Sequence, residues 1–216
     1  IDEKAREAFF ASGEEHIDHV LGHIRLHLAT DFHPRKALDF GCGVGRLVIP
    51  LSKVVEEVVG IDISSSMIVE ARKNCQNRAI TNAHFASSAS ELSTKFDLIH
   101  SFIVFQHIPV AKGERIFKCL INRLSPGGVG VLHFTYHAPK YARLVHWVLR
   151  NIPFACHLYN LLIGRSLTYP IMQSNFYNLN SLFCILQLEK CSNASLEFTQ
   201  HKRNSGIILY FQKDAE

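Results

Sequence analysis

Three glycines at alternating positions follow a short apolar run, and this pattern constrains the fold of the chain more than any other feature. The stretch reads Ala37-Leu38-Asp39-Phe40-Gly41-Cys42-Gly43-Val44-Gly45. Its apolar beginning predicts a strand, and the residues after Gly45 predict a helix. Because glycine lacks Cβ, it reaches positive φ at little cost and lets backbone come close to a ligand. The sequence therefore predicts a strand–turn–helix unit whose turn approaches a bound molecule.

A carboxylate follows the next apolar run. Asp62 comes directly after residues 57–61, seventeen positions beyond Gly45. Because parallel strands end at the same edge of a sheet, we expect Asp62 beside the glycine turn, where it suits the diol of a ribose. A nicotinamide or flavin fingerprint is disfavoured, since its third glycine would fall at Arg46.

Strand-like and helix-like segments alternate along most of the chain. We expect strands at about 36–40, 57–61, 82–86, 96–101, 129–135, 194–200 and 206–212, and helices at 3–11, 14–29, 45–53, 65–77, 110–124 and 179–190. An apolar, helix-prone insertion at 138–175 interrupts the alternation. This order predicts an α/β protein with a mostly parallel sheet, folded as one domain over 1–216 with N-terminal helices within 1–30.

The composition is that of a compact globular protein. Hydrophobic residues make up 47% of the chain and charged residues 19%, which argues against disorder. The net charge of +4 is spread out and neither requires nor excludes a nucleic acid or an anionic membrane as partner. Six cysteines without a Cys-x-x-Cys pair are typical of reduced thiols. With charged residues in place of a signal peptide, we expect a cytoplasmic protein.

The stretch 37–47 resembles motif I of the class I S-adenosylmethionine-dependent methyltransferases, and the resemblance extends over about 30–136 and 178–213. It implies a Rossmann-like, doubly wound sheet of seven strands whose last strand is antiparallel. It also implies S-adenosyl-L-methionine as methyl donor and S-adenosyl-L-homocysteine as product. A hairpin turn that suits this topology is expected at Arg203-Asn204-Ser205-Gly206.

The same resemblance implies a cofactor site at the carboxyl ends of the strands. Asp39, Gly41 and Gly43 would hold the methionine moiety of the donor. Asp62 would accept hydrogen bonds from the two ribose hydroxyls. The other members of the glycine turn that belong to the expected site are Cys42, Gly45 and Arg46.

Residues after the second, third and fourth strands complete the expected cofactor site. They are Ile63, Met67, Ser88, Ala89, Ser101 and Phe102. The first two would pack on the adenine, and the last two would lie beneath the sulfonium. Ser88 and Ala89 stand where many relatives have an acidic residue that accepts from the adenine amino group, so Ser88 or a backbone group would replace it.

Few catalytic side chains are expected, because methyl transfer from a sulfonium is an in-line displacement from an activated donor. A hydroxyl or ammonium acceptor must still lose a proton, and His107 is the candidate base or orienting group. The alternative is a histidine that only bonds a backbone carbonyl. Candidate substrate contacts, with packing as the alternative, are Tyr136, His137, Tyr141, Tyr169 and Tyr177.

The acceptor class is inferred mainly from missing motifs. Residues 101–104 lack the Asp/Asn-Pro-Pro-aromatic motif of nucleobase amine methyltransferases, and no basic cluster with interleaved aromatics marks a nucleic-acid groove. We therefore expect a small-molecule acceptor, with the insertion at 138–175 as a lid or apolar pocket wall. A dimer interface or a membrane-surface patch is the alternative role for the insertion. An RNA or protein methyltransferase that works with a partner, or a non-catalytic scaffold, remains as the alternative function.

Four histidines share one face of the expected helix at 14–29. His16, His19, His23 and His27 are spaced by three, four and four residues, a pattern that is able to bind zinc or nickel. No companion cluster of ligands is visible in the sequence. We therefore interpret them as a half-exposed surface stripe and expect no metal site.

Overall fold

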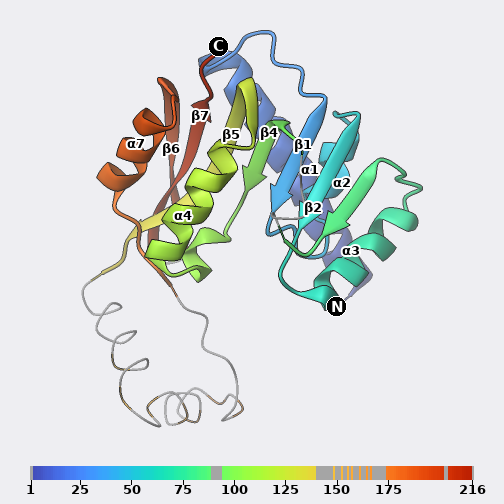
Figure 1. The fold of residues 1–216 in the computed structure, drawn as a ribbon. Helices are drawn as coiled ribbons and strands as arrows, with labels where there is room; N and C mark the ends of the chain where they lie inside the picture. The colour runs from blue at the N-terminus through green and yellow to red at the C-terminus, as the bar shows by residue number, and fades with distance from the viewer. Residues whose placement is uncertain are drawn as a thin grey trace.

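The computed structural model describes residues 2–88, 94–139, 174–201 and 204–215, with isolated positions between 140 and 173. Seven strands form one sheet in the order β3-β2-β1-β4-β5-β7-β6 (Figure 1). The strands are β1 (Lys36–Phe40), β2 (Glu57–Ile61), β3 (Ala83–Ala86), β4 (Phe96–Ser101), β5 (Leu124–His137), β6 (Asn193–His201) and β7 (Asn204–Gln212). Neighbours among β1 to β5 pair in parallel, whereas β7 runs antiparallel between β5 and β6. The predicted doubly wound, Rossmann-like α/β fold is confirmed.

Helices connect the strands close to the positions that the sequence predicts. They are α1 (Glu3–His27), α2 (Val48–Ser52), α3 (Ser65–Gln76), the short 3-10 helix η2 (Phe105–His107), α4 (Val110–Ile121) and α7 (Leu179–Leu188). The side chain of Ser64 caps α3 by accepting from the amide of Met67. The insertion expected at 138–175 lies mostly outside the described residues.

The prediction of two N-terminal helices is wrong, because α1 continues through Gly13 without a break. A Cβ on Gly13 would lie 2.5 Å from the carbonyl oxygen of Arg46. The absence of a side chain therefore lets α1 pack closely against the turn that follows β1. Gly13 serves this close approach and does not end a helix.

The predicted hairpin turn at 203–206 is also wrong. His201 pairs with Asn204, and Thr199 pairs with Gly206, so the last three residues of the expected turn already belong to β7. Gly206 pairs with Thr135 of β5 as well. Pairing on both sides of β7 overrides the local turn preference of this segment. The connection falls at 202–203, outside the described residues.

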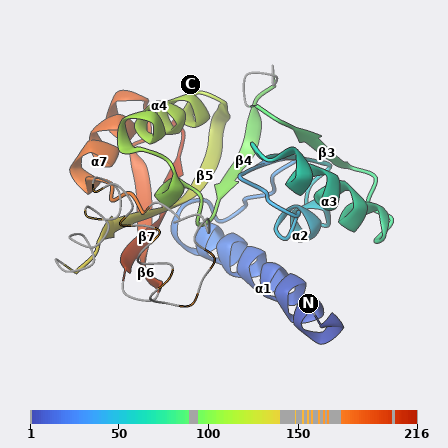
Figure 2. The same ribbon diagram turned by 90° about the horizontal axis from the view of Figure 1, so that it is seen from below.

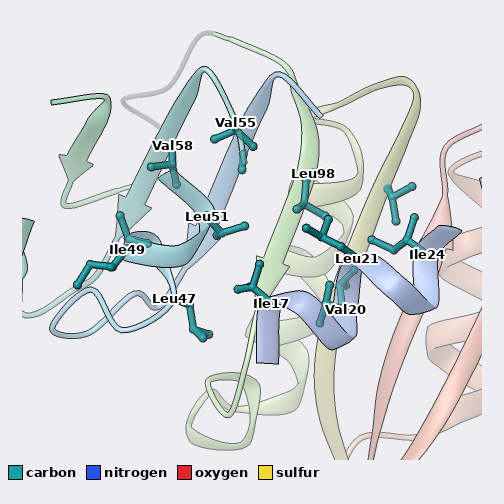
Figure 3. Packing of buried hydrophobic residues seen from close by; sticks show 14 of the residues in the cluster. Ile17, Val20, Leu21, Ile24, Leu47, Ile49, Leu51, Val55, Val58 and Leu98 are labelled. Carbon is teal, nitrogen blue, oxygen red and sulfur yellow. The ribbon is translucent and has the colours of Figure 1, made fainter. Parts of the chain in front are cut away.

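Apolar residues that alternate along the strands build two cores, one on each face of the sheet. Ala37, Val58 and Leu98 belong to the core under α1 and α2, which Figure 3 shows from close by. Their next neighbours along the chain, such as Leu38 and Ile99, belong to the core under α4 and α7. Figure 2 shows α1 and α4 on opposite sides of the strands. A residue's place in this alternation therefore decides which helices it meets.

Candidate cofactor site

The glycine turn between β1 and α2 is held against the ends of two neighbouring segments. All three glycines have positive φ, at 80° for Gly41, 53° for Gly43 and 85° for Gly45. A Cβ on Gly41 would lie 2.3 Å from Val104 Cγ2, so the chain after β4 packs directly on this glycine. At Gly43 a Cβ would meet no described atom within 4 Å. The turn is thus closed at its first glycine and open at its second.

Asp62 fixes the turn as well as facing it. Its carboxylate accepts from the amide of Gly43 at 2.9 Å and from the amide of Ser64 at 2.8 Å. The amides of Gly41 and Cys42 donate to the carbonyl of Ile61. These two turn amides therefore bond the end of β2. A carboxylate has about four acceptor positions, so Asp62 keeps capacity for the hydroxyls of a ribose.

Asp39 lies deep in the site, and its carboxylate is only half satisfied. Its side chain is 2% exposed, and Oδ1 lies 3.1 Å from Nδ1 of His100. Within the described part of the chain, Oδ2 has no hydrogen-bond partner. A buried carboxylate oxygen without a donor is costly, and a cationic donor group on a ligand would remove that cost. This orphaned oxygen fits the ammonium of a methionine moiety.

His100 and His16 continue the contact from Asp39 to the N-terminal helix. Nε2 of His100 lies 3.0 Å from Nε2 of His16. Asp39 and His100 are register partners on β1 and β4, and the alternation of the strands turns both toward α1. The sequence predicted His16 only as part of a half-exposed surface stripe and indicated no role for His100. The signal that could have found His100 is a polar residue in a buried strand on the same face as Asp39.

Burial, to which the nearby His100 and Arg46 add, lowers the pKa of His16 from 6.5 to about 2. Unfolded His16 binds a proton below about pH 6.5 while folded His16 does not, so the free energy of unfolding falls as the pH is lowered through 6.5. At pH 5 this loss amounts to about 2 kcal/mol. Between pH 7.5 and pH 5, the free energy of unfolding of His16→Gln should therefore fall by about 2 kcal/mol less than that of the unmodified protein, as measured by urea denaturation. His33→Gln, at an exposed position, should leave the pH dependence unchanged.

The adenine side of the site exposes apolar side chains. Ile63, between β2 and α3, is 91% exposed, and Met67, in the first turn of α3, is 43% exposed. Apolar surface in this position suits a flat heterocycle. Ser88 follows β3 and is half-buried, whereas Ala89 lies outside the described residues.

The side chains of two residues in the glycine turn pack against other parts of the protein. Cys42 is buried in the core under α1, and burial raises the pKa of its thiol. Arg46 lies over the rings of Phe9 and Phe102, with its guanidinium carbon 5.5 and 6.0 Å from their centres. Contacts from Cys42 to a cofactor would therefore come from its backbone. Arg46 connects the turn to α1.

The end of β4 is held in place by contacts with β1 and α1. The Ser101 hydroxyl donates to the carbonyl of Phe40 at 2.8 Å. The ring of Phe102 lies 4.3 Å from that of His16. Ile103 has a φ of 62°, which a β-branched residue rarely adopts. Since strained backbone persists only where its surroundings hold it, the packing of Val104 on Gly41 is part of what fixes this loop.

His107 ends η2, and its ring is oriented by a side chain. Nε2 of His107 lies 3.1 Å from Nε2 of Gln106, whose Oε1 accepts from the Thr135 hydroxyl. With Oε1 accepting, the Gln106 amide donates to His107. A base or acceptor-orienting role for His107 stays a prediction. The ring of His107 contacts the side-chain amide of Gln106.

The candidate substrate residues occupy different environments. Tyr177 is buried, its hydroxyl lies 3.1 and 2.9 Å from the carbonyl oxygens of Phe105 and Ile108, and it therefore holds η2 in place. The geometry favours this positioning role over a substrate contact. Tyr136 packs against the core under α4 and α7, and His137 is exposed. Tyr141 and Tyr169 lie outside the described residues.

The histidine stripe of α1 is half-exposed, as predicted, but several of its members contact the sheet. His23 stacks on Tyr210 with ring centres 4.0 Å apart, and His19 lies 2.9 Å from the Glu197 carboxylate. Among the described residues, no group of three or more His, Cys, Asp or Glu side chains is arranged to hold a metal ion. In the same part of the chain, no helix combines the length and apolarity needed to cross a bilayer.

Comparison with known sequences gives the same family as motif I. A profile described as a methyltransferase domain matches residues 37–128. A ubiquinone biosynthesis O-methyltransferase of Chelativorans sp. strain BNC1 is 31% identical over 142 residues, which are 62% of this chain and 55% of that protein. An uncharacterized RNA methyltransferase of Thermosynechococcus vestitus is 32% identical over 111 residues, which are 50% of this chain and 24% of that protein. The chain spans just over half the length of the first O-methyltransferases that it matches.

Comparison with solved structures extends the likeness to nearly the whole chain. Magnesium protoporphyrin IX methyltransferase from Synechocystis PCC 6803, solved with bound S-adenosylhomocysteine, has a TM-score of 0.66 and 22% sequence identity. The match covers 99% of this chain and 89% of that one. Together with the glycine turn and Asp62, these matches identify residues 37–128 as a methyltransferase domain, and the strand order gives the chain the fold of the class I S-adenosylmethionine-dependent methyltransferases.

Proposed function

We propose that the chain binds S-adenosylmethionine at the edge formed by β1, β2 and β4 and transfers its methyl group to a small-molecule acceptor. The observation that carries this proposal is the placement of two carboxylates, Asp39 and Asp62, at the ends of the neighbouring strands β1 and β2 beside the glycine turn. Oδ2 of Asp39 is the orphaned acceptor described above, and Asp62 keeps capacity beyond its two backbone amides. Gly43 lies between these two residues in the sequence, and the open space beside it leaves room for a ligand.

The residues present fit S-adenosylmethionine at both of its ends. Asp39 would receive the ammonium of the methionine moiety, and Asp62 would receive the ribose hydroxyls. Ile63 and Met67 would cover the adenine with apolar surface. Bound there, S-adenosylmethionine supplies a methyl group that is already activated on a sulfonium. The chain then has to align an acceptor atom with it and exclude water.

The chain's own residues perform this alignment from β4 onward. Phe102 and the constrained backbone at Ile103 form the floor on which the reacting groups would meet. Tyr177 holds η2 through the carbonyl of Phe105, and Gln106, within η2, orients the ring of His107. When the acceptor is a hydroxyl or an ammonium, His107 would act as the base that takes its proton.

Two observations support a small molecule as the acceptor. The O-methyltransferase relative aligns with 62% of this chain, and the solved neighbour that covers 99% of it is named for a porphyrin substrate. The RNA methyltransferase relative matches only 24% of its own length, which leaves most of that protein without a counterpart here. An oxygen nucleophile on an apolar small molecule is therefore the first acceptor class to test.

The test starts from binding and proceeds to turnover. Calorimetric titration should show saturable, micromolar binding of S-adenosylmethionine and S-adenosylhomocysteine to the purified chain. Phenols and enols of increasing apolar size are then supplied with the donor, and S-adenosylhomocysteine is measured by mass spectrometry. His107→Gln should bind the donor normally and turn it over more slowly, by about 10²–10⁴-fold for a lost base. Absence of donor binding in the unmodified chain would overturn the proposal.

A further inference from the structure

A chain of hydrogen-bonding groups runs from the N-terminal helix to the carboxylate of Asp39. It consists of His16 on α1, His100 on β4 and Asp39 on β1. The two links measure 3.0 Å between the Nε2 atoms of the histidines and 3.1 Å between His100 Nδ1 and Asp39 Oδ1. The side chains of both inner members are 1–2% exposed. The proposed function uses Asp39 but gives no part to His16 or His100.

The donors and acceptors of this chain can be assigned in one direction. An ionised carboxylate only accepts, so His100 must donate to Asp39 from Nδ1. Nε2 of a neutral His100 then accepts, and His16 donates to it from its own Nε2. Each link fixes the ring orientation of the next member. Asp39 is thereby held through Oδ1, and Oδ2 is left for a donor that the described residues do not supply.

Further packing holds His16 in place. The His16 ring lies 4.3 Å from the ring of Phe102 and 5.1 Å from that of His100. Gly13, one turn earlier on α1, approaches the carbonyl of Arg46 closely. The helix is therefore seated against the end of β1 and the end of β4 at the same time. A substitution at His16 therefore alters the support of the donor site while leaving every residue of the sheet unchanged.

We propose that His16 and His100 are positioning residues for the methyl donor: they hold the Asp39 carboxylate so that Oδ2 receives the ammonium of the methionine moiety. This inference rests on the proposed function, since it requires the donor to bind beside Asp39. It assigns to the N-terminal helix a direct part in cofactor affinity. It also separates His16 from His19 and His23, which contact β6 and β7.

The experiment compares two ligands that differ in the group which Asp39 would hold. S-adenosylhomocysteine carries the methionine-derived ammonium, whereas 5′-methylthioadenosine lacks the whole amino-acid portion. Both are titrated by calorimetry into the full chain and into His16→Leu, His16→Gln and His23→Leu. Gln keeps a donor near the position of Nε2. His23 is the matched control, because it lies two turns further along α1 and contacts Ser195 and Glu197 instead.

We expect His16→Leu to weaken binding of S-adenosylhomocysteine by about 5–20-fold, the effect of a lost polar link to a charged group, and to change binding of 5′-methylthioadenosine less than about 2-fold. His16→Gln should recover most of the affinity, and His23→Leu should bind both ligands normally even where it lowers stability. Equal weakening of both ligands in His16→Leu, or no weakening of either, would overturn the inference while leaving the proposed function intact. Failure of the unmodified chain to bind either ligand would instead overturn the proposed function, and this inference with it.

Discussion

Replacing Asp62 by alanine is expected to abolish measurable binding of the methyl donor while leaving a folded protein. Two hydrogen bonds from ribose hydroxyls to a charged acceptor would be lost, at about 1.5–3 kcal/mol each. Since about 1.4 kcal/mol corresponds to a tenfold change, the affinity should fall by about 100-fold or more. Titration calorimetry with S-adenosylhomocysteine measures this loss directly.

Asp97 provides a matched control for the structural part of the Asp62 effect. Like Asp62, it is half-buried and accepts from two backbone amides, those of Arg35 and Lys36 at 2.9 and 3.0 Å. It lies at the beginning of β4, whereas the glycine turn lies beyond the opposite, carboxyl ends of the parallel strands. Both alanine variants should therefore lose about 1–3 kcal/mol of stability. Only Asp62→Ala should lose the donor, and equal binding by the two variants would contradict the assignment of Asp62.

The features that could be predicted from the sequence are those determined by local pattern. Alternation of apolar residues gave the strands, and the glycine turn followed by Asp62 gave the edge at which a nucleotide-like ligand would lie. Each of these depends on residues within about one strand–helix unit of one another. The seven-stranded topology came from the family resemblance, because strand order is not visible in local periodicity.

The features that were missed depend on contacts between distant segments. His16 meets His100 across 84 positions of the chain, and no periodicity within α1 reports that contact. Gly13 was expected to end a helix, but its place against Arg46 makes it part of a close helix–turn contact. Three residues of the turn expected at 203–206, those at 204–206, lie in β7, because β5 and β6 both pair with this strand. In each case tertiary packing overrode the local preference.

The missed contacts also change how the site is understood. Family motifs account for the residues that would touch the donor, and these lie on loops at the ends of strands. The groups that hold those residues come from elsewhere, from α1 through His16 and from the segment before α7 through Tyr177. A site of this kind keeps its geometry only while the outlying elements are docked. Variants on α1 are therefore expected to affect cofactor affinity as well as stability.

Alanine at Gly41 is expected to cause a large loss of stability. The position has a φ of 80°, which costs about 1–2 kcal/mol with a Cβ present. The added Cβ would also lie 2.3 and 2.7 Å from the two γ-methyl groups of Val104. Overpacking of this kind costs about 1–3 kcal/mol more. We therefore expect Gly41→Ala to lower the free energy of unfolding by about 3 kcal/mol, measured by urea denaturation.

Two other glycines separate the causes of this effect. Gly127 has a φ of 75° and Gly43 one of 53°, and at neither would a Cβ meet a described atom within 4 Å. Both alanine variants should lose only the backbone cost of about 1–2 kcal/mol. Gly43→Ala should in addition weaken donor binding, because its methyl group enters the open space of the turn, whereas Gly127→Ala should bind the donor normally.

The double variant Gly41→Ala with Val104→Ala tests the clash itself. Removing the two γ-methyl groups leaves Val104 Cβ as the nearest atom, at 3.0 Å from the added methyl group. Stability lost in Gly41→Ala should then be partly recovered, even though Val104→Ala alone removes packing and is destabilising. If Gly41→Ala were no less stable than Gly127→Ala, the packing of the loop after β4 on the glycine turn would not be what holds this edge of the site together.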